Sequence, residues 1–162
     1  MLLILLRHGV AEDAKDDSDF GDGARHLTKE GRRGVKKMAR FLRKRDAAPT
    51  HIYSSPRVRA LESADIVREE FEAEDIGILP SLDIGGAWPA FVKDLTRRVT
   101  DKDAVVVVAG HEPVLGQFLG NALGFPEGAI PLKKGAMVAL QFGDASLRSV
   151  AELAWAMAPK LL

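Results

Sequence analysis

The sequence predicts a three-layer α/β/α protein in which helices cover both faces of a mostly parallel sheet. Two continuous apolar runs, at residues 2–6 and 104–109, are typical of strands that are buried on both faces. Between them, stretches with helical periodicity alternate with short extended stretches, which is the pattern of β-α-β units. The 162 residues contain no internal repeat and no linker, so we expect one domain over residues 1–162.

The first helix is the most clearly marked of the expected elements. Thr28 is a suitable N-cap, and apolar residues then recur at helical spacing. These apolar residues are Val35, Met38, Ala39 and Leu42. The acidic, Gly-containing segment before it, residues 12–26, is expected to be a loop, with a solvated acidic run at Asp13–Asp22. The other expected elements are a strand at 51–54, a helix opening at Ser55-Pro56, a connection at 76–89, a helix near 90–99, a helix from Pro113, a loop at 124–135 and a hairpin of 136–142 with 147–155.

The charge and cysteine content exclude several classes of function. Lys and Arg total 23, as do Asp and Glu, so no general attraction to nucleic acid or to anionic membranes is expected. The chain has no cysteine, which excludes disulfides, thiolate metal sites and cysteine nucleophiles. The opening apolar run has six residues before Arg7, too few for a signal peptide or a membrane span, and we expect a cytoplasmic protein.

Polar motifs stand at the carboxyl ends of three of the expected strands. Arg7-His8 follows residues 2–6, Ser54-Ser55 ends the strand at 51–54, and His111 follows residues 104–109. Ligands of open parallel sheets bind beyond the carboxyl ends of the strands. These side chains are therefore expected to meet at one edge of the sheet.

The residue types at this edge suit phosphoryl transfer. Catalysis of this reaction is mainly positioning and electrostatic stabilisation of the charge on the phosphoryl oxygens. The planar guanidinium of Arg7 can bind two such oxygens and keeps its charge. The imidazole of His8 is a nucleophile at neutral pH, because the ordinary pKa of histidine is about 6.5.

Four ordered motifs then show that the chain resembles the histidine phosphatase superfamily, the phosphoglycerate mutase-like enzymes, and within it the short SixA-type phosphohistidine phosphatases. The resemblance covers nearly the whole chain and implies the phosphoglycerate mutase-like fold. The motifs are Leu6-Arg7-His8-Gly9, Arg25-His26-Leu27-Thr28 with Glu30-Gly31, Ser54-Ser55-Pro56-Arg57-Val58-Arg59-Ala60 and Gly110-His111-Glu112-Pro113, and the ending Met157-Ala158-Pro159 is also similar to that subfamily.

The resemblance implies a role for each matching residue. His8 attacks phosphorus and becomes phosphohistidine, and water then hydrolyses this intermediate. Arg7, Arg59 and His111 hold the phosphoryl oxygens, and Arg25 joins them, as in the SixA-type members. The resemblance implies no metal and no organic cofactor.

One feature departs from the wider family. Larger members place a glutamate in the middle of the chain as general acid, whereas residues 80–86 contain none, and Asp83 is the nearest carboxylate by position. An alkoxide leaving group needs a proton from such an acid, but a phosphoimidazole protonated on its other nitrogen leaves as neutral imidazole. Unless Glu12 or Asp13 reaches the site, the missing acid favours phosphohistidine as the substrate.

Other interpretations of these residues are open on the sequence alone. His8 can be a structural histidine at a strand end, His111 a cap of the helix at Pro113, and Arg59 a surface residue. Arg25 can form a surface salt bridge, and Arg57 is expected to be solvated or at the rim of the site.

Two further functions compete with a phosphatase of a phosphorylated protein, such as a histidine-containing phosphotransfer domain. One is a phosphatase of a small phosphorylated metabolite, and the other is a phosphate-binding module without catalysis. A mutase is disfavoured because the chain lacks the inserted segments that retain a bisphosphate.

Overall fold

The computed structural model describes residues 1–14 and 22–162, and within these residues six strands form one sheet. The strands are β1 (Leu2–Arg7), β2 (His51–Ser54), β3 (Gly77–Ile78), β4 (Val105–Gly110), β5 (Met137–Gln141) and β6 (Glu152–Met157). Their order across the sheet is β3-β2-β4-β1-β5-β6. The first four pair in parallel, whereas β5 is antiparallel to both β1 and β6. The predicted mostly parallel sheet is confirmed, with an antiparallel pair at one side.

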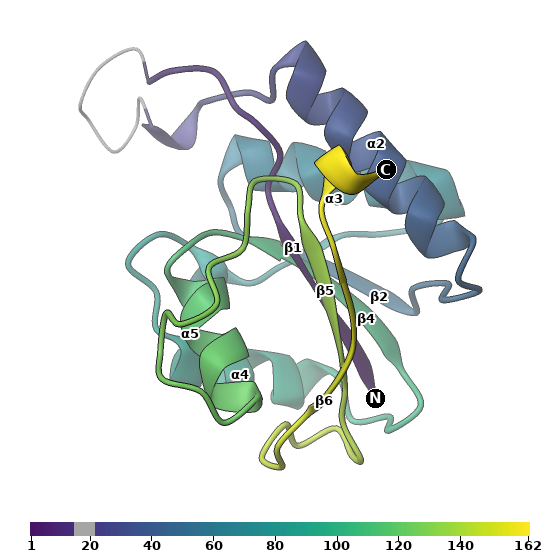
Figure 1. Cartoon of the computed structure of the whole chain (residues 1–162), viewed down its shortest axis with the longest axis vertical. Helices are drawn as coiled ribbons and strands as arrows, with labels where there is room; N and C mark the ends of the chain where they lie inside the picture. The colour runs from purple at the N-terminus through teal and green to yellow at the C-terminus, as the bar shows by residue number, and fades with distance from the viewer. Residues whose placement is uncertain (15–21) are drawn as a thin grey trace.

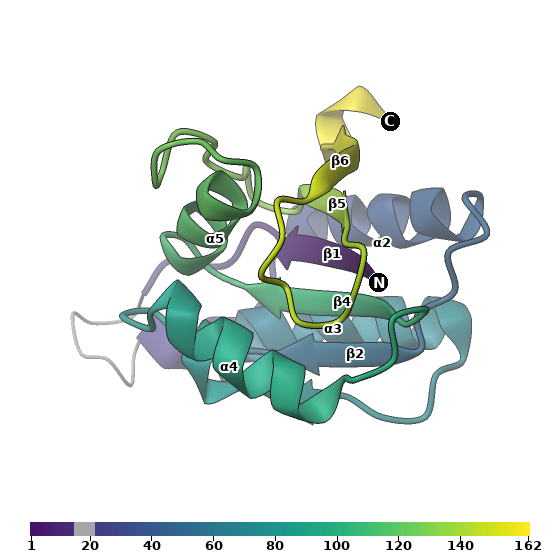
Figure 2. The same cartoon turned by 90° about the horizontal axis from the view of Figure 1, so that it is seen from below.

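Helices cover both faces of this sheet, which confirms the three layers (Figures 1 and 2). On one face lie α2 (Lys29–Arg43) and α3 (Val58–Phe71), and on the other lie α4 (Trp88–Arg98) and α5 (Val114–Ala122). Short 3-10 turns occur at Pro80–Leu82 and Pro159–Leu161. None of the helices in residues 1–14 and 22–162 is long and apolar enough to cross a bilayer.

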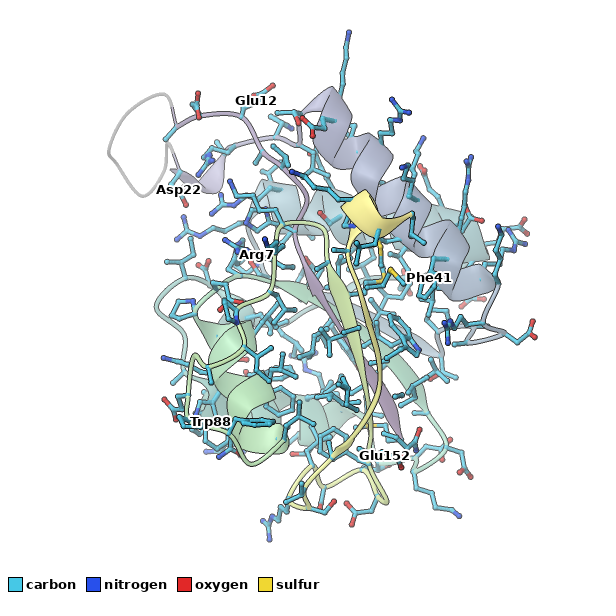
Figure 3. The ribbon with its side chains drawn as sticks, viewed as in Figure 1. Arg7, Glu12, Asp22, Phe41, Trp88 and Glu152 are labelled. Atoms are coloured by element: carbon cyan, nitrogen blue, oxygen red, sulfur yellow. The ribbon has the colours of Figure 1, made fainter. Side chains whose placement is uncertain are left out.

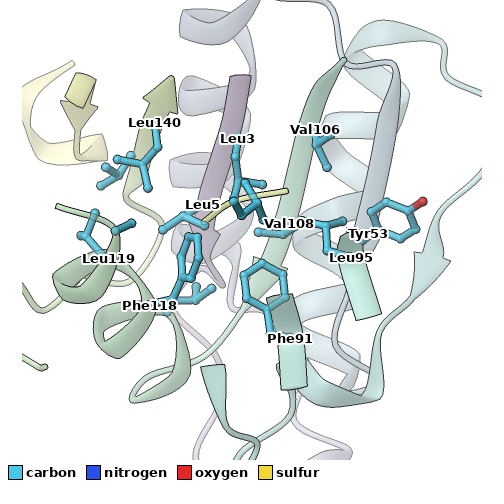
Figure 4. Packing of buried hydrophobic residues seen from close by; sticks show 14 of the residues in the cluster. Leu3, Leu5, Tyr53, Phe91, Leu95, Val106, Val108, Phe118, Leu119 and Leu140 are labelled. Carbon is cyan, nitrogen blue, oxygen red and sulfur yellow. The ribbon is translucent and has the colours of Figure 1, made fainter. Parts of the chain in front are cut away.

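Strand β1 supplies side chains to both hydrophobic cores, which explains its continuous apolar sequence. Leu3 and Leu5 point into the core under α4 and α5, together with Phe91 and Phe118 (Figure 4). Ile4 and Leu6 point into the core under α2 and α3. Successive side chains of a strand alternate between faces, so only an all-apolar strand suits a sheet that is covered on both sides.

Helix α2 forms where its sequence pattern predicts. The Oγ1 of Thr28 accepts a hydrogen bond from the backbone N–H of Gly31 at 3.0 Å, as expected of an N-cap. The four residues of the predicted apolar face, at positions 35, 38, 39 and 42, are fully buried.

The structure corrects three details of the expected elements. The connection at 76–89 contains the two-residue edge strand β3, which is too short to show a period in the sequence. The helix expected to open at Ser55-Pro56 begins at Val58. The last strand begins at Glu152 rather than at 147, because residues 143–151 form a loop in which Leu147 adopts a positive φ of 57°.

Candidate active site

The carboxyl ends of β1, β2 and β4 meet at one edge of the sheet, as the sequence predicts. Arg7 lies opposite Gly110 and Ser54 opposite Ala109 in the parallel register. The backbone N–H of His8 continues the ladder and donates to the carbonyl of Gly110 at 3.1 Å. This pairing fixes the end of β1 and places His8 beside the end of β4.

The imidazole of His8 is buried, with 5% of the residue exposed, and is oriented by contacts at both ring nitrogens. Nδ1 lies 2.7 Å from the carbonyl oxygen of Gly9, which can only accept, so the proton is on Nδ1. Nε2 then carries the lone pair and accepts from Nε of Arg59 at 3.3 Å. Burial, together with the charges of Arg59, Arg7 and Lys134, lowers the pKa of His8 to about 4. His8 is thus neutral near pH 7, with its lone pair on Nε2.

His111 lies against His8, with 4.9 Å between the ring centroids. Its Nε2 is 2.7 Å from Oγ of Ser55, and the same Oγ accepts from the backbone N–H of Arg57 at 3.2 Å. The hydroxyl proton of Ser55 is therefore free to donate to Nε2, which puts the imidazole proton on Nδ1. Burial, followed by the nearby His8 and the charges of Arg59 and Arg57, lowers the pKa of His111 to about 2. Nδ1 is a buried donor for which the described residues provide no acceptor.

Arg59 extends from the first turn of α3 and is 2% exposed. Ser63, one turn further along α3, links the backbone of Arg59 to the backbone of Gly9, the residue after His8. Oγ of Ser63 donates to the carbonyl of Arg59 at 2.7 Å and accepts from the N–H of Gly9 at 3.1 Å. Gly9 passes so close to α2 that a Cβ there would lie 2.9 Å from the carbonyl oxygen of Gly31, which explains the glycine.

Arg7 lies at the end of β1, at the same end of the molecule as Asp22 and opposite to Glu152 (Figure 3). Its Nη1 donates to the carbonyl of Leu132 at 2.6 Å. Its Nε is buried and has no acceptor among the described residues. A buried donor without an acceptor is costly, and an anionic ligand would satisfy it.

Asp22 is an acidic residue inside this cationic site. Its Oδ2 accepts from Nη2 of Arg59 and from Nη1 of Arg57, both at 2.8 Å, and its Oδ1 accepts from Nη1 of Arg25 at 2.9 Å. Its backbone carbonyl accepts from Nη1 of Arg59 at 2.6 Å. Partial burial disfavours its charge, but hydrogen bonds from Arg25 and Arg59 and the charges of Arg59 and Arg57 lower the pKa of Asp22 to about 2.

The role of Asp22 is a correction to the expected solvated loop. Residues 22 and 23 are helical rather than extended, and the carboxylate pairs with arginines instead of facing water alone. The part of the predicted acidic run at residues 15–21 lies outside the described residues. The spacing of Asp22 and Arg25, three residues apart, is the one sequence signal that indicates this pairing.

Arg57, expected to be solvated or at the rim of the site, is not solvated, because 7% of the residue is exposed. Its Nε donates to Oδ1 of Asp83 at 2.5 Å, and that oxygen also accepts from the N–H of Ile84 at 2.7 Å. Asp83 is thus held by Arg57 at the border of the site. Arg25, at the opposite border, donates from Nε to the carbonyl of Glu12 at 2.5 Å in addition to its pair with Asp22.

The other carboxylates considered from the sequence are Glu12 and Asp13, and both are exposed. Residues 26 and 27 are held against α3 by Glu62, whose carboxylate accepts from His26 and from the N–H of Leu27 and also pairs with Arg32. His26 is therefore a structural residue at the surface.

The site combines two neutral imidazoles with at least three guanidinium groups. Such an arrangement favours an anion with several acceptor oxygens. Within residues 1–14 and 22–162, no three His, Asp or Glu side chains come together in a way that could hold a metal ion. The strand ends and the first turn of α3 bring together Arg7, His8, Arg59 and His111, as predicted. Arg25 and Asp83 lie at the borders of the site, where Arg25 donates to Asp22 and Asp83 accepts from Arg57.

Comparison with known proteins agrees with this geometry. Residues 3–83 match the model of the histidine phosphatase superfamily, branch 1. The chain is 32% identical over 155 residues to an uncharacterized protein of Picosynechococcus sp., covering 92% of this chain and 90% of that protein. It is 28% identical over 152 residues to the mitochondrial serine/threonine-protein phosphatase Pgam5 of Drosophila persimilis, covering 76% of this chain and 51% of Pgam5. The chain thus spans about half the length of Pgam5.

A solved structure shows the same fold over the whole chain. The protein histidine phosphatase SixA, complexed with tungstate, superposes with a TM-score of 0.83 and covers 99% of both chains at 23% identity. The expected phosphoglycerate mutase-like architecture is confirmed by this likeness and by the match of residues 3–83.

Proposed function

The chain belongs to the histidine phosphatase superfamily and is a phosphatase, and from this premise we propose that it hydrolyses its substrate through a phosphohistidine formed on His8. One observation carries this proposal: the buried imidazole of His8 is neutral and has its Nε2 lone pair among cationic side chains, while Nδ1–H is held by the carbonyl of Gly9. A nucleophile must present a lone pair where the electrophile is bound.

In the first step, Nε2 of His8 forms a bond to phosphorus, and the bond between phosphorus and the leaving group breaks. The imidazole becomes positively charged, and the hydrogen bond from Nδ1 to the carbonyl of Gly9 strengthens as this charge develops. In the second step, the oxygen of a water molecule bonds to phosphorus, the bond to Nε2 breaks and inorganic phosphate leaves. The imidazole is neutral again.

The phosphoryl oxygens are proposed to lie against Arg7, Arg59 and His111. Two observations support this assignment: Nε of Arg7 and Nδ1 of His111 are buried donors that lack acceptors among the described residues. Fixed donors aimed at developing charge are the main source of catalysis in phosphoryl transfer. We also propose that Arg25 reaches the same anion once its contact with Asp22 is broken.

We propose phosphohistidine on a protein as the substrate. The argument depends on the leaving group, which for phosphohistidine is a neutral imidazole and needs no strong acid in the site. Two carboxylates are bound to arginines of the site: Asp22, whose pKa is lowered to about 2, and Asp83, which accepts from Arg57 at the border. SixA, which has the same fold, is described as a protein histidine phosphatase.

The test compares two kinds of substrate on the purified protein: a phosphorylated histidine-containing phosphotransfer domain and p-nitrophenyl phosphate. We expect a higher kcat/KM for the phosphohistidine, and a higher value for the ester would overturn the substrate assignment. His8→Ala should lower turnover of both by at least about a thousandfold. The control is His51→Ala, since His51 lies at the amino end of β2, away from the site. Unchanged phosphate release by His8→Ala would show that the nucleophile is another group.

Asp83 is proposed as the general acid for ester substrates, and its substitution separates this role from a structural one. Asp83→Asn keeps an oxygen that can accept from Arg57. If Asp83 donates a proton, the variant loses turnover of p-nitrophenyl phosphate less than turnover of an alkyl phosphate, whose leaving group is more basic. Equal losses for both esters would rule this role out.

A further inference from the structure

A groove of about 910 Å³ adjoins the active site on the side of α2. Its lining includes Arg7 and Gly9, on either side of His8 in the chain, and is otherwise formed mainly by the first half of α2, the turn before β5 and the turn after β6. Besides Arg7, its lining includes five basic side chains: Arg33, Lys37, Lys133, Lys134 and Lys160. We call this feature the basic groove. Among its described lining residues, Glu30 is the one acidic side chain.

The basic groove carries more positive than negative charge among the described residues. Throughout residues 1–14 and 22–162, no acidic side chain forms an ion pair with any of its five lysine and arginine residues. The chain as a whole has a formal net charge of zero, so this surplus is local. The charge of Lys134 is one of the causes that lower the pKa of His8, after burial and the charges of Arg59 and Arg7.

Backbone contacts fix the basic groove relative to His8. The N–H of Gly135 donates to the carbonyls of His8 and Arg7 at 2.9 and 3.0 Å, which holds the Lys133–Lys134 turn against the end of β1. Gly135 has a φ of 76°, and a Cβ there would lie 3.0 Å from Cγ of Pro159. The turn after β6 therefore packs directly on this turn and beside α2, where Figure 1 shows the C-terminal residues.

We propose that the basic groove binds an acidic segment of the phosphoprotein substrate while its phosphoryl group enters between Arg7 and His8. This inference rests on the function proposed above and adds the chemistry by which the protein partner is recognised. The basic side chains come from three segments and are exposed, except for the half-buried Lys37. A small metabolite with a second anionic group needs a compact set of buried donors, whereas spaced exposed cations suit the carboxylates of an acidic polypeptide.

The experiment uses a variant that lacks the groove cations of α2 and of the turn after β6, and it keeps Lys133 and Lys134, whose turn is bonded to the backbone of His8. This groove variant is Arg33→Gln/Lys37→Gln/Lys160→Gln. Its matched control, Lys36→Gln/Lys93→Gln/Lys102→Gln, removes the same charge from exposed positions outside the groove. The substrates are phosphoramidate and two synthetic phosphohistidine peptides, one flanked by glutamates and the other by glutamines.

We expect the groove variant to raise KM for the glutamate peptide about tenfold, because each exposed charge pair contributes modestly to binding. Its kcat/KM for phosphoramidate and for the glutamine peptide should change less than about twofold. The advantage of the glutamate peptide on the unmodified protein should shrink as NaCl rises from about 0.05 M to about 0.5 M. Equal KM values for both peptides on the unmodified protein, or equal effects of the groove and control variants, would overturn the proposal.

A binding measurement separates this proposal from the proposed function. The unphosphorylated glutamate peptide is titrated into His8→Ala protein, with and without the three groove substitutions, and followed by fluorescence anisotropy. Weaker binding to the groove variant supports docking even if no phosphohistidine peptide is hydrolysed. Identical binding refutes docking even if the peptides are good substrates.

Discussion

Asp22 holds the guanidinium groups that the proposed reaction requires for a phosphoryl group, so Asp22→Ala is expected to tighten phosphate binding. All three nitrogens of Arg59 have protein partners: Nε donates to His8, Nη1 to the carbonyl of Asp22 and Nη2 to its carboxylate. A carboxylate and a phosphate bind such groups in the same way and cannot share the same N–H donors. Asp22 is therefore a competitor for the phosphate within the chain.

The pKa of Asp22 gives the size of this competition. A decrease from 3.8 to about 2 corresponds to about 2 kcal/mol of favourable interaction for the carboxylate. The side chain is 28% exposed, so solvent already screens part of this interaction, and a bound phosphate recovers only the remainder. We expect the inhibition constant of inorganic phosphate to fall about tenfold in Asp22→Ala, which corresponds to about 1.4 kcal/mol.

The assay measures inhibition of p-nitrophenyl phosphate turnover by inorganic phosphate. Asp65→Ala is the matched control, since Asp65 forms an ion pair of the same spacing with Arg68 in α3. A lowered pKa means that the carboxylate is ionised above pH 3.8 and loses its contacts only as the pH falls toward 2. The effect should therefore be constant between about pH 5 and pH 8. Unchanged or weaker inhibition in Asp22→Ala would show that Asp22 positions Arg59 and does not compete with phosphate.

Three further predictions concern the imidazoles and the core. The pKa of His8 is lowered to about 4, so between pH 6.5 and 4 the unfolded chain binds a proton that the folded chain does not. Its contribution to the free energy of unfolding is greatest above pH 6.5 and should fall by about 3 kcal/mol toward pH 4, measured as the difference between the unmodified protein and His8→Gln in urea. Ser55→Ala removes the hydroxyl that orients His111 and should lower kcat/KM about tenfold. Ser54→Ala is the control and should have little effect on kcat/KM, because the Oγ of Ser54 donates to the carbonyl of the neighbouring Ser55. Phe91→Ala should lower the free energy of unfolding by about 3–5 kcal/mol, because the ring is fully buried, and a loss below about 1 kcal/mol would contradict the packing described.

The parts of the fold that depend on burial were predictable from the sequence. The runs at 2–6 and 104–109 are apolar at every position because β1 and β4 are covered on both faces, and α2 shows its period because one side of it is buried. The edge strand β3 has two residues and no period, so it could not be recognised. The loop at 143–151 depends on local turns and on Leu147 in a left-handed conformation, which apolar residues rarely adopt.

Some residues of the candidate site were likewise predictable from the sequence, and others were not. Side chains at strand ends, such as His8 and His111, are brought together by the strand register, which the order of the elements already implies. For Arg57, which was expected to be solvated or at the rim of the site, burial could not be foreseen, because its partners Asp22 and Asp83 come from two connecting segments on either side of it in the chain. The approach of two loops is a tertiary property that no local pattern indicates.

The position of β1 at the centre of the sheet determines how much of the site must move during a turnover. The backbone on both sides of His8 is bonded to β4 and to the turn before β5, so its amide should exchange with solvent only when the core of the sheet opens. Asp22 lies on a short helical turn with a partly exposed side chain, and its arginine contacts can break without disturbing any strand. The attacking atom is therefore preorganised, and binding of the substrate needs to rearrange only the side chains that hold the anion.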